Sequence, residues 1–238
     1  MAIAGLVGGL GPESTVDYYR RILELWQAMR PGTLPALVID SLDVHRGIEL
    51  VRTDRDGLLR YLHASVERLA RAGCDFAAMA ANTPHLVFDQ LAARASIPLV
   101  SIVAACAEEA RSRGLRRVGL LGTGFTMEAG FYPDVFGRMG IEVRVPGAAA
   151  RAWLHERYLG ELLGGVFRDE TRDGVHRLVD ELLHTDAIEA VVLAGTELPL
   201  LVRNDTIAGL PLLDTTALHV RAIVSRLLGP LSGSLQRG

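Results

Sequence analysis

Two segments of the chain combine small residues, hydroxyl groups and a proline directly after an apolar run. One is AAMAANTPH at residues 77–85, and the other is AVVLAGTELPLL at residues 190–201. Each apolar run is typical of a buried strand. Small and polar residues after such a strand are typical of a small-ligand site at the carboxyl end of a parallel sheet. The residues there that could bind a carboxylate or transfer a proton are Asn82, Thr83, His85, Thr196 and Glu197.

Two glycine-containing turns could supply further donors to the same site. The turn at residues 8–12 leads into a predicted helix, so Gly11 and Ser14 could bind an anion near the helix start. The alternative is a tight turn that needs glycine only for its backbone. In the turn at residues 122–126, Thr123 and Thr126 could hold a carboxylate through neutral donors or could cap a helix.

A loop at residues 41–46 follows the second predicted strand and could close over the site. Asp43 is a candidate general base if its surroundings move its pKa toward the working pH. Arg46 could bind a substrate carboxylate with its planar guanidinium, and the alternative is an ordinary surface arginine. The cysteines, Cys74 and Cys106, are expected to pack as small hydrophobic residues.

The elements that must position these residues repeat along the chain. Gly195 follows Ala81 by 114 residues, and the same offset relates GLVG at 5–8 to GLLG at 119–122 and Tyr18 to Tyr132. This period is too long for a solenoid and indicates a duplicated half-domain. We therefore predict two related lobes, with the turns after residues 80 and 194 facing each other across a cleft.

Apolar runs alternate with stretches of helical spacing, which predicts an α/β fold with mostly parallel sheets. We expect one lobe to comprise residues 1–97 plus 212–238 and the other residues 98–211. A loop is expected at 147–151 and a helix at 158–167. The cleft should be lined by the loops that end the strands, at 8–14, 41–46, 81–85, 122–126 and 195–197.

Composition excludes several classes of function. All 25 residues counted as lysine or arginine are arginine, so neither a pyridoxal-phosphate Schiff base nor a P-loop lysine is possible. The seven histidines lack metal-ligand spacing, and no G-x-S-x-G motif occurs. The net charge of −3 does not provide the excess of positive charge that binding to nucleic acid or an anionic membrane requires. We expect no metal, no cofactor, no disulfide and a cytoplasmic protein.

Five motifs together resemble the aspartate/glutamate racemase superfamily, the cofactor-independent racemases, over nearly the whole chain. They are GGLGPEST at 8–15, NTPH at 82–85, GLLGT at 119–123 with TME at 126–128 and Tyr132, GVFRDET at 165–171 and TELPL at 196–200. The resemblance implies two pseudo-symmetric lobes and a homodimer. It also implies that Arg168 replaces a family lysine that binds the distal carboxylate of the substrate.

The family's chemistry, as the resemblance implies it, uses two thiols on opposite faces of the substrate α-carbon. Their positions correspond to Ala81 and Gly195, and neither is a cysteine. Cys74 precedes its strand and Cys106 lies on a predicted helix, so neither is expected to substitute. An alanine and a glycine would also widen the site, which favours a substrate bulkier than aspartate.

We therefore expect an enzyme that acts on a small or medium carboxylic acid by altered, non-thiol chemistry, as an isomerase, lyase or cyclase. Glu197, His85 and Asp43 are the candidate acid–base groups. Two alternatives stay open: a non-catalytic ligand-binding protein on the same scaffold, and an amino-acid racemase that uses non-thiol groups.

Overall fold

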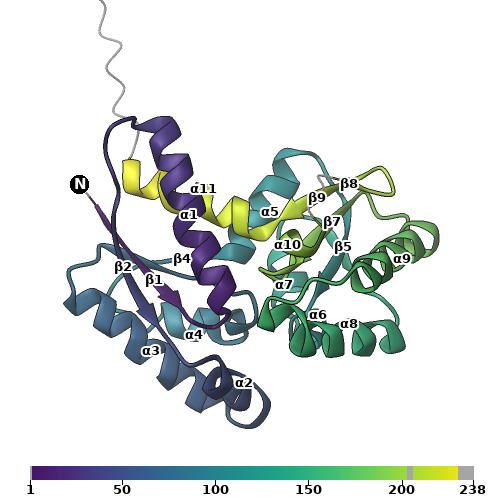
Figure 1. The fold of residues 1–238 in the computed structure, drawn as a ribbon, viewed down its shortest axis with the longest axis horizontal. Helices are drawn as coiled ribbons and strands as arrows, with labels where there is room; N and C mark the ends of the chain where they lie inside the picture. The colour runs from purple at the N-terminus through teal and green to yellow at the C-terminus, as the bar shows by residue number, and fades with distance from the viewer. Residues whose placement is uncertain (1, 203–205, 230–238) are drawn as a thin grey trace, which may run out of the picture.

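The computed structural model describes residues 2–202 and 206–229, which form two lobes side by side (Figure 1). Each lobe contains a sheet whose main strands are parallel, with the order β2-β1-β3-β4 in the first and β6-β5-β7-β9-β8 in the second. The first sheet comprises β1 (Ile3–Gly8), β2 (Ala36–Ser41), β3 (Phe76–Met79) and β4 (Leu99–Val100). The second comprises β5 (Arg117–Gly122), β6 (Glu142–Arg144), β7 (Ala190–Ala194), β9 (Leu210–Asp214) and the antiparallel β8 (Thr206–Ile207).

Helices cover both faces of the first sheet, because successive residues of a strand point to opposite faces. Ala4 and Leu6 of β1 pack in a core with α1 and α11, whereas Val7 packs with α3. The helices of this lobe are α1 (Pro12–Met29), α2 (Val44–Thr53), α3 (Arg55–Arg71), the 3-10 helix η1 (Thr83–Val87) and α4 (Phe88–Ala92).

The second sheet is covered in the same way. Leu120 of β5 packs with α5 and α7, and Leu121 packs with α8 and α9. The helices are α5 (Ile102–Ser112), α6 (Gly124–Glu128), α7 (Phe131–Gly137), α8 (Ala148–Gly160), η2 (Leu162–Gly164), α9 (Asp169–Asp186) and α10 (Leu198–Val202). The predicted α/β fold with two lobes and mostly parallel sheets is confirmed.

The last helix, α11 (Thr215–Leu228), connects the lobes. It follows β9 of the second sheet, and its residues Val220 and Val224 join the core of the first lobe with Tyr18 and Trp26 of α1. Figure 1 shows α11 passing behind α1 toward α5. The two lobes are thus held in contact by a shared helix.

The sheets divide the chain differently from the predicted lobes of residues 1–97 plus 212–238 and residues 98–211. Leu99 and Val100 pair with β3 of the first sheet, and residues 212–214 pair with β7 of the second. Backbone pairing requires each short strand to lie beside its buried neighbour, so the chain crosses between sheets one element later than predicted. Residue 1 and residues 230–238 of the predicted first lobe lie outside the described residues.

Two local predictions were wrong. The predicted loop at 147–151 forms the start of α8, because its alanines are strong helix formers. The predicted helix at 158–167 is only the last turn of α8 followed by η2, and it ends at Gly165, whose φ of +74° is left-handed. Within the described ranges, no helix combines the length and the hydropathy needed to span a membrane.

Candidate active site

A cavity of about 70 Å³ lies where the carboxyl ends of the two sheets face each other. The turn after β3 contributes residues 81–84, and the turn after β7 contributes residues 194–197. These are the two turns predicted to face each other. Leu10, Thr123 and Phe125 follow β1 and β5, and the remaining lining comes from α2, α3, α8 and η2.

Glu197 lies in the wall of this cavity with 2% of its surface exposed. Its Oε1 atom accepts a hydrogen bond from Ser14 Oγ at 2.6 Å, and its Oε2 atom accepts one from Thr196 Oγ1 at 3.1 Å. The Tyr158 hydroxyl donates a third hydrogen bond to Oε2. Since buried carboxylate oxygens require such partners, hydroxyl groups from both lobes hold this side chain in place.

The first-lobe turn is shaped to admit the Glu197 carboxylate. A Cβ atom at Gly11 would lie only 2.5 Å from Glu197 Oε1, so glycine is required there for this approach. Ser14, in the first turn of α1, also contacts Thr196 Oγ1 at 2.7 Å. The predicted substrate-binding residues Gly11, Ser14 and Thr196 therefore position Glu197, and Gly11 and Ser14 do not line the cavity.

Tyr158 of α8 fills the space beside Gly195. A Cβ atom at Gly195 would lie 2.5 Å from Tyr158 Cε2 and 2.6 Å from its hydroxyl oxygen, which is closer than a real side chain can approach. Burial first, and then the charge of Glu197, raises the pKa of the Tyr158 hydroxyl well above its usual range. The phenol is therefore a neutral hydrogen-bond donor at neutral pH.

Another part of the cavity wall carries a cluster of three threonines. Thr83 Oγ1 lies 3.2 Å from Thr123 Oγ1 and 3.1 Å from Thr126 Oγ1, and the last two lie 3.1 Å apart. Thr83 and Thr123 line the cavity, and Thr126 stands behind them. Thr123 is also the N-cap of α6, because it accepts from Thr126 N at 3.2 Å. Hydroxyls in such a cluster can turn toward a ligand as neutral donors.

Ala81 and Asn82 complete this wall. Ala81 offers only a methyl group, and it has no titratable neighbour among residues 82–84. The Asn82 amide bridges the lobes: its Nδ2 donates to Thr215 Oγ1 at 3.2 Å, and its Oδ1 accepts from the Tyr132 hydroxyl at 2.6 Å. Asn82 is therefore engaged mainly in fixing the turn.

His85 does not lie in this cavity. It is 4% exposed, stacks on Phe88 with ring centroids 4.8 Å apart and lines a different hollow beside Phe131. Burial lowers its pKa to about 3, with a smaller contribution from His219. The prediction of His85 as an acid–base group of the cleft is wrong in position, because its ring stacks on Phe88 and lines the other hollow instead of this cavity.

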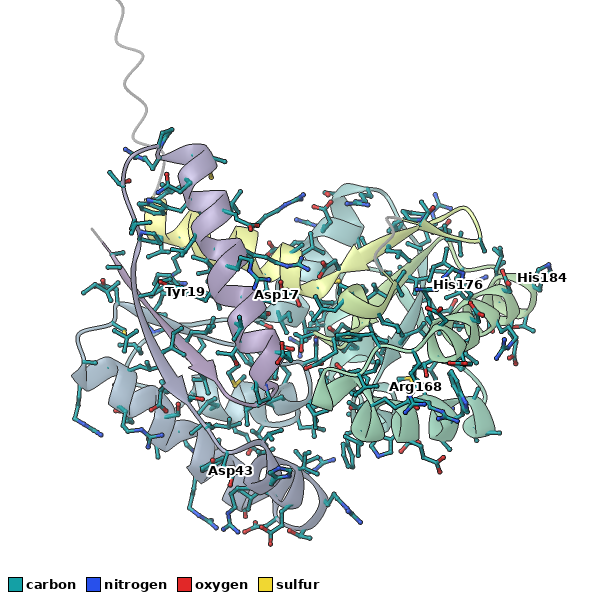
Figure 2. The ribbon with its side chains drawn as sticks, in the orientation of Figure 1. Asp17, Tyr19, Asp43, Arg168, His176 and His184 are labelled. Atoms are coloured by element: carbon teal, nitrogen blue, oxygen red, sulfur yellow. The ribbon has the colours of Figure 1, made fainter. Side chains whose placement is uncertain are left out.

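Asp43 and Arg46 belong to the outside of α2. Asp43 is the N-cap of that helix and accepts from the backbone N–H groups of His45 and Arg46. Figure 2 shows Asp43 at the start of α2. The Arg46 side chain is 54% exposed and pairs with Glu49 at 2.9 Å. Neither lines the cavity, since Val44, Gly47, Ile48 and Val51 form the inner face of the helix.

Arg168 also lies outside the cavity, on the connection between η2 and α9 (Figure 2). Its side chain is 61% exposed, and its Nε atom lies 3.6 Å from Glu161 Oε1. Glu161 in turn accepts from Thr171 and pairs with Arg157. Arg168 is therefore not placed to bind a distal carboxylate of a substrate in this cavity.

The two cysteines pack in the cores, as the sequence predicted. Cys74 belongs to the core beside α3, and Cys106 is completely buried between α5 and α7. Burial raises the pKa of both thiols. Neither lines the cavity, and a thiol with a raised pKa is a poor nucleophile or base. Among the residues that the structure describes, no group of three or more His, Cys, Asp or Glu could hold a metal ion.

Tyr158 is a residue of the cavity wall that the sequence did not predict. It lies at the end of α8, inside a stretch predicted to be a different helix. A glycine at 195, where the resemblance places a larger side chain, was the available signal that another residue fills that volume.

The sequence profile of the Asp/Glu/hydantoin racemase family matches residues 7–223. A candidate Asp/Glu racemase from Yersinia pestis has a solved structure that superposes with a TM-score of 0.86 at 32% identity, covering 96% of this chain and 100% of that one. An aspartate racemase homologue from Pyrococcus horikoshii gives 0.82 and 33%, with the same coverage.

A more distant relative has a broader described activity. The broad specificity amino-acid racemase RacX of Bacillus subtilis is 25% identical over 143 residues. That match spans 58% of this chain and 62% of RacX, so the chain aligns with less than two thirds of that relative.

Proposed function

The chain belongs to the Asp/Glu/hydantoin racemase family, and we propose that it transfers a proton at the α-carbon of a small or medium carboxylic acid bound in the cavity. One observation carries the proposal: the Tyr158 hydroxyl occupies the space of a side chain at residue 195 and donates to the buried Glu197 carboxylate. Position 195 corresponds to the second thiol in the family's chemistry. A phenol–carboxylate couple thus replaces that thiol.

The proposed proton transfer has a forward step, in which the substrate loses its α-proton, and a reverse step, in which the proton is returned. The Tyr158 oxygen takes the α-proton while its own proton passes along the hydrogen bond to Glu197 Oε2. The electron pair of the broken C–H bond moves into the substrate carboxylate, which becomes an enediolate. Return of both protons reverses the step and regenerates the couple, as general acid–base catalysis requires.

The threonine wall supplies the complementary half of the reaction. Thr83 and Thr123 offer neutral hydroxyl donors to the substrate carboxylate. Hydrogen bonds to that group strengthen as negative charge develops in the enediolate. An aliphatic hydroxyl gives up its proton far less readily than a phenol, so these donors bind the carboxylate without transferring their protons.

Among the described residues that line the cavity, Tyr158 and Glu197 form the only acid–base couple. Ala81 stands where the resemblance places the first thiol, and its methyl group cannot donate or accept a proton. Proton removal and return should therefore occur on one face of the α-carbon. The result is exchange of the α-proton with retention of configuration, or protonation of the α-carbon after another group has left. Racemisation, which needs a proton donor on each face, is not expected. An isomerase or lyase reaction at one face fits this arrangement.

Proton NMR in D₂O tests the proposal directly. The α-proton signals of both enantiomers of aspartate and glutamate, and of 2-phenylpropionate, would be followed with purified protein. We expect loss of the signal for at least one acid, without change of its configuration. Tyr158→Phe and Glu197→Gln should each slow the exchange by about 10²-fold or more.

The control is Tyr18→Phe, which also removes a buried tyrosine hydroxyl, bonded to His219 Nδ1 at 2.9 Å and away from the cavity. Tyr18→Phe should leave the rate of α-proton exchange within about threefold of the wild-type rate, since it changes neither Tyr158 nor Glu197. Exchange with racemisation would contradict the one-sided reaction and favour the non-thiol racemase. Binding without any exchange would contradict catalysis and favour a ligand-binding protein.

Two further expectations from the sequence remain proposals. The resemblance implies a homodimer, which sedimentation of the purified protein would test. A cytoplasmic location is expected from the sequence alone, and fractionation of the source cells would test it.

A further inference from the structure

The walls of the cavity beyond the two polar turns are apolar. Val44, Ile48 and Val51 recur at helical spacing on the inner face of α2, and Leu10 lies beside them. From the second lobe, Phe125 and Leu163 close the other side. Apolar side chains from both lobes therefore surround whatever extends from the α-carbon of the substrate.

No residue in the described lining of the cavity is an arginine or a histidine. Arg46 and Arg168, the cations expected to bind a second carboxylate, are more than half exposed and pair with Glu49 and Glu161. A carboxylate that loses water without a cation or a full set of donors is strongly disfavoured. The Glu197 side chain in the wall would add repulsion to a second negative charge on the substrate.

We propose that the substrate carries a single carboxylate and an apolar α-substituent, of branched alkyl or aromatic type, rather than a second carboxylate. This inference rests on the proposed function, because that function places the α-carbon between Tyr158 and the threonine wall. The carboxylate then faces Thr83 and Thr123, and the substituent extends between α2 and η2. The burial of each methylene group should strengthen binding about fourfold.

The orientation of α2 makes this specificity testable on one helix. Its inner face, with Ile48, contacts the cavity, whereas its outer face carries the exposed Arg46–Glu49 pair. A change at Ile48 therefore alters the cavity wall, and a change at Arg46 alters only the surface. The two variants share one helix and the same backbone surroundings.

Isothermal titration calorimetry with the purified protein would compare 2-phenylpropionate, succinate and aspartate. We expect 2-phenylpropionate to bind at least tenfold more tightly than either diacid. Ile48→Ala should weaken its binding by about tenfold, since it removes buried carbon atoms from the wall. Ile48→Arg should reverse the preference toward succinate, and the control Arg46→Ala should leave all three affinities within about twofold.

Succinate or aspartate binding more tightly than 2-phenylpropionate would overturn the inference, and so would no binding of any probe. An unchanged affinity in both Ile48 variants, with their fold verified by circular dichroism, would also overturn it. These failures are distinct from failure of the proposed function. Tight binding of 2-phenylpropionate without α-proton exchange would support the apolar substituent and contradict only the proton transfer.

Discussion

A cysteine side chain at residue 195 should clash with the ring of Tyr158. The new Cβ atom of Gly195→Cys would lie 2.5, 2.6 and 2.8 Å from Cε2, the hydroxyl oxygen and Cζ of that ring. Tyr158 is 4% exposed and packs in the core with Leu154 and Leu162, so the ring cannot move without losing contacts. Overpacking of this kind costs about 1–3 kcal/mol. Loss of the hydrogen bond to Glu197 would add about 1.5–3 kcal/mol.

Urea unfolding would measure the cost, and a second substitution would locate it. Gly195→Cys alone should lower the free energy of unfolding by about 2.5–6 kcal/mol. Tyr158→Leu removes both the obstructing ring and its hydrogen bond to Glu197, so Gly195→Cys should cost about 2.5–6 kcal/mol less in that background. The matched control is Gly160→Cys, near Tyr158 on α8, where an added Cβ meets no atom within 4 Å.

Two results would refute this reasoning. One is a Gly195→Cys protein as stable as the wild type, with Tyr158 unmoved in its structure. The other is equal cost of the substitution with and without the Tyr158 ring, which would mean that the ring is not the obstacle. If the reasoning holds, restoring two thiols requires three changes, Ala81→Cys, Gly195→Cys and a smaller residue at 158.

Three further outcomes follow from the contacts. Arg168→Ala should leave the affinity for any cavity ligand within about twofold, by calorimetry, because this exposed side chain does not line the cavity. Burial lowers the pKa of His85 to about 3 and that of His219 to about 4. The unfolded chain therefore binds more protons below pH 6.5, and each histidine should reduce stability by about 1.4 kcal/mol per pH unit from pH 6 toward pH 4. His85→Phe should flatten that decline in urea unfolding at several pH values. Ser14→Ala should lower stability by about 1–3 kcal/mol and slow exchange, because it removes a donor to buried Glu197.

The sequence predicted the fold and the two central turns because those depend on local patterns. Buried strands followed by small residues mark residues 81–84 and 195–197 without any knowledge of the partner lobe. The orientation of the arginine side chains was harder to predict. Arg46 is next in sequence to a residue that lines the cavity, and its own side chain still faces solvent. Helical spacing of Val44, Ile48 and Val51 carried the needed information about α2, and the loop prediction at 41–46 obscured it.

Tyr158 could not be predicted from local pattern. Its role depends on α8 packing against the end of β7, and those segments are 37 residues apart at Tyr158 and Gly195. His85 shows the reverse case: a histidine beside a polar turn attracted a catalytic interpretation, although stacking on Phe88 orients it elsewhere. Chain position identified the turns, and tertiary packing decided which side chains reach the cavity.

The duplication explains why the site is chemically one-sided. Thr83 and Glu197 are related by the 114-residue offset, and each reaches across to the first turn of the other lobe. Thr83 meets Thr123 and Thr126, whereas Glu197 meets Ser14. The same exchange of contacts therefore places a carboxylate on one wall and neutral hydroxyls on the other.

That asymmetry separates the two tasks of the proposed reaction. A charged group beside the threonines would compete with a substrate carboxylate, and a neutral group in place of Glu197 could not accept the proton of Tyr158. Exchanging Thr83 for glutamate should consequently abolish carboxylate binding rather than create a second base. A Thr83→Glu variant that bound 2-phenylpropionate normally and racemised it would contradict the division of roles between the walls.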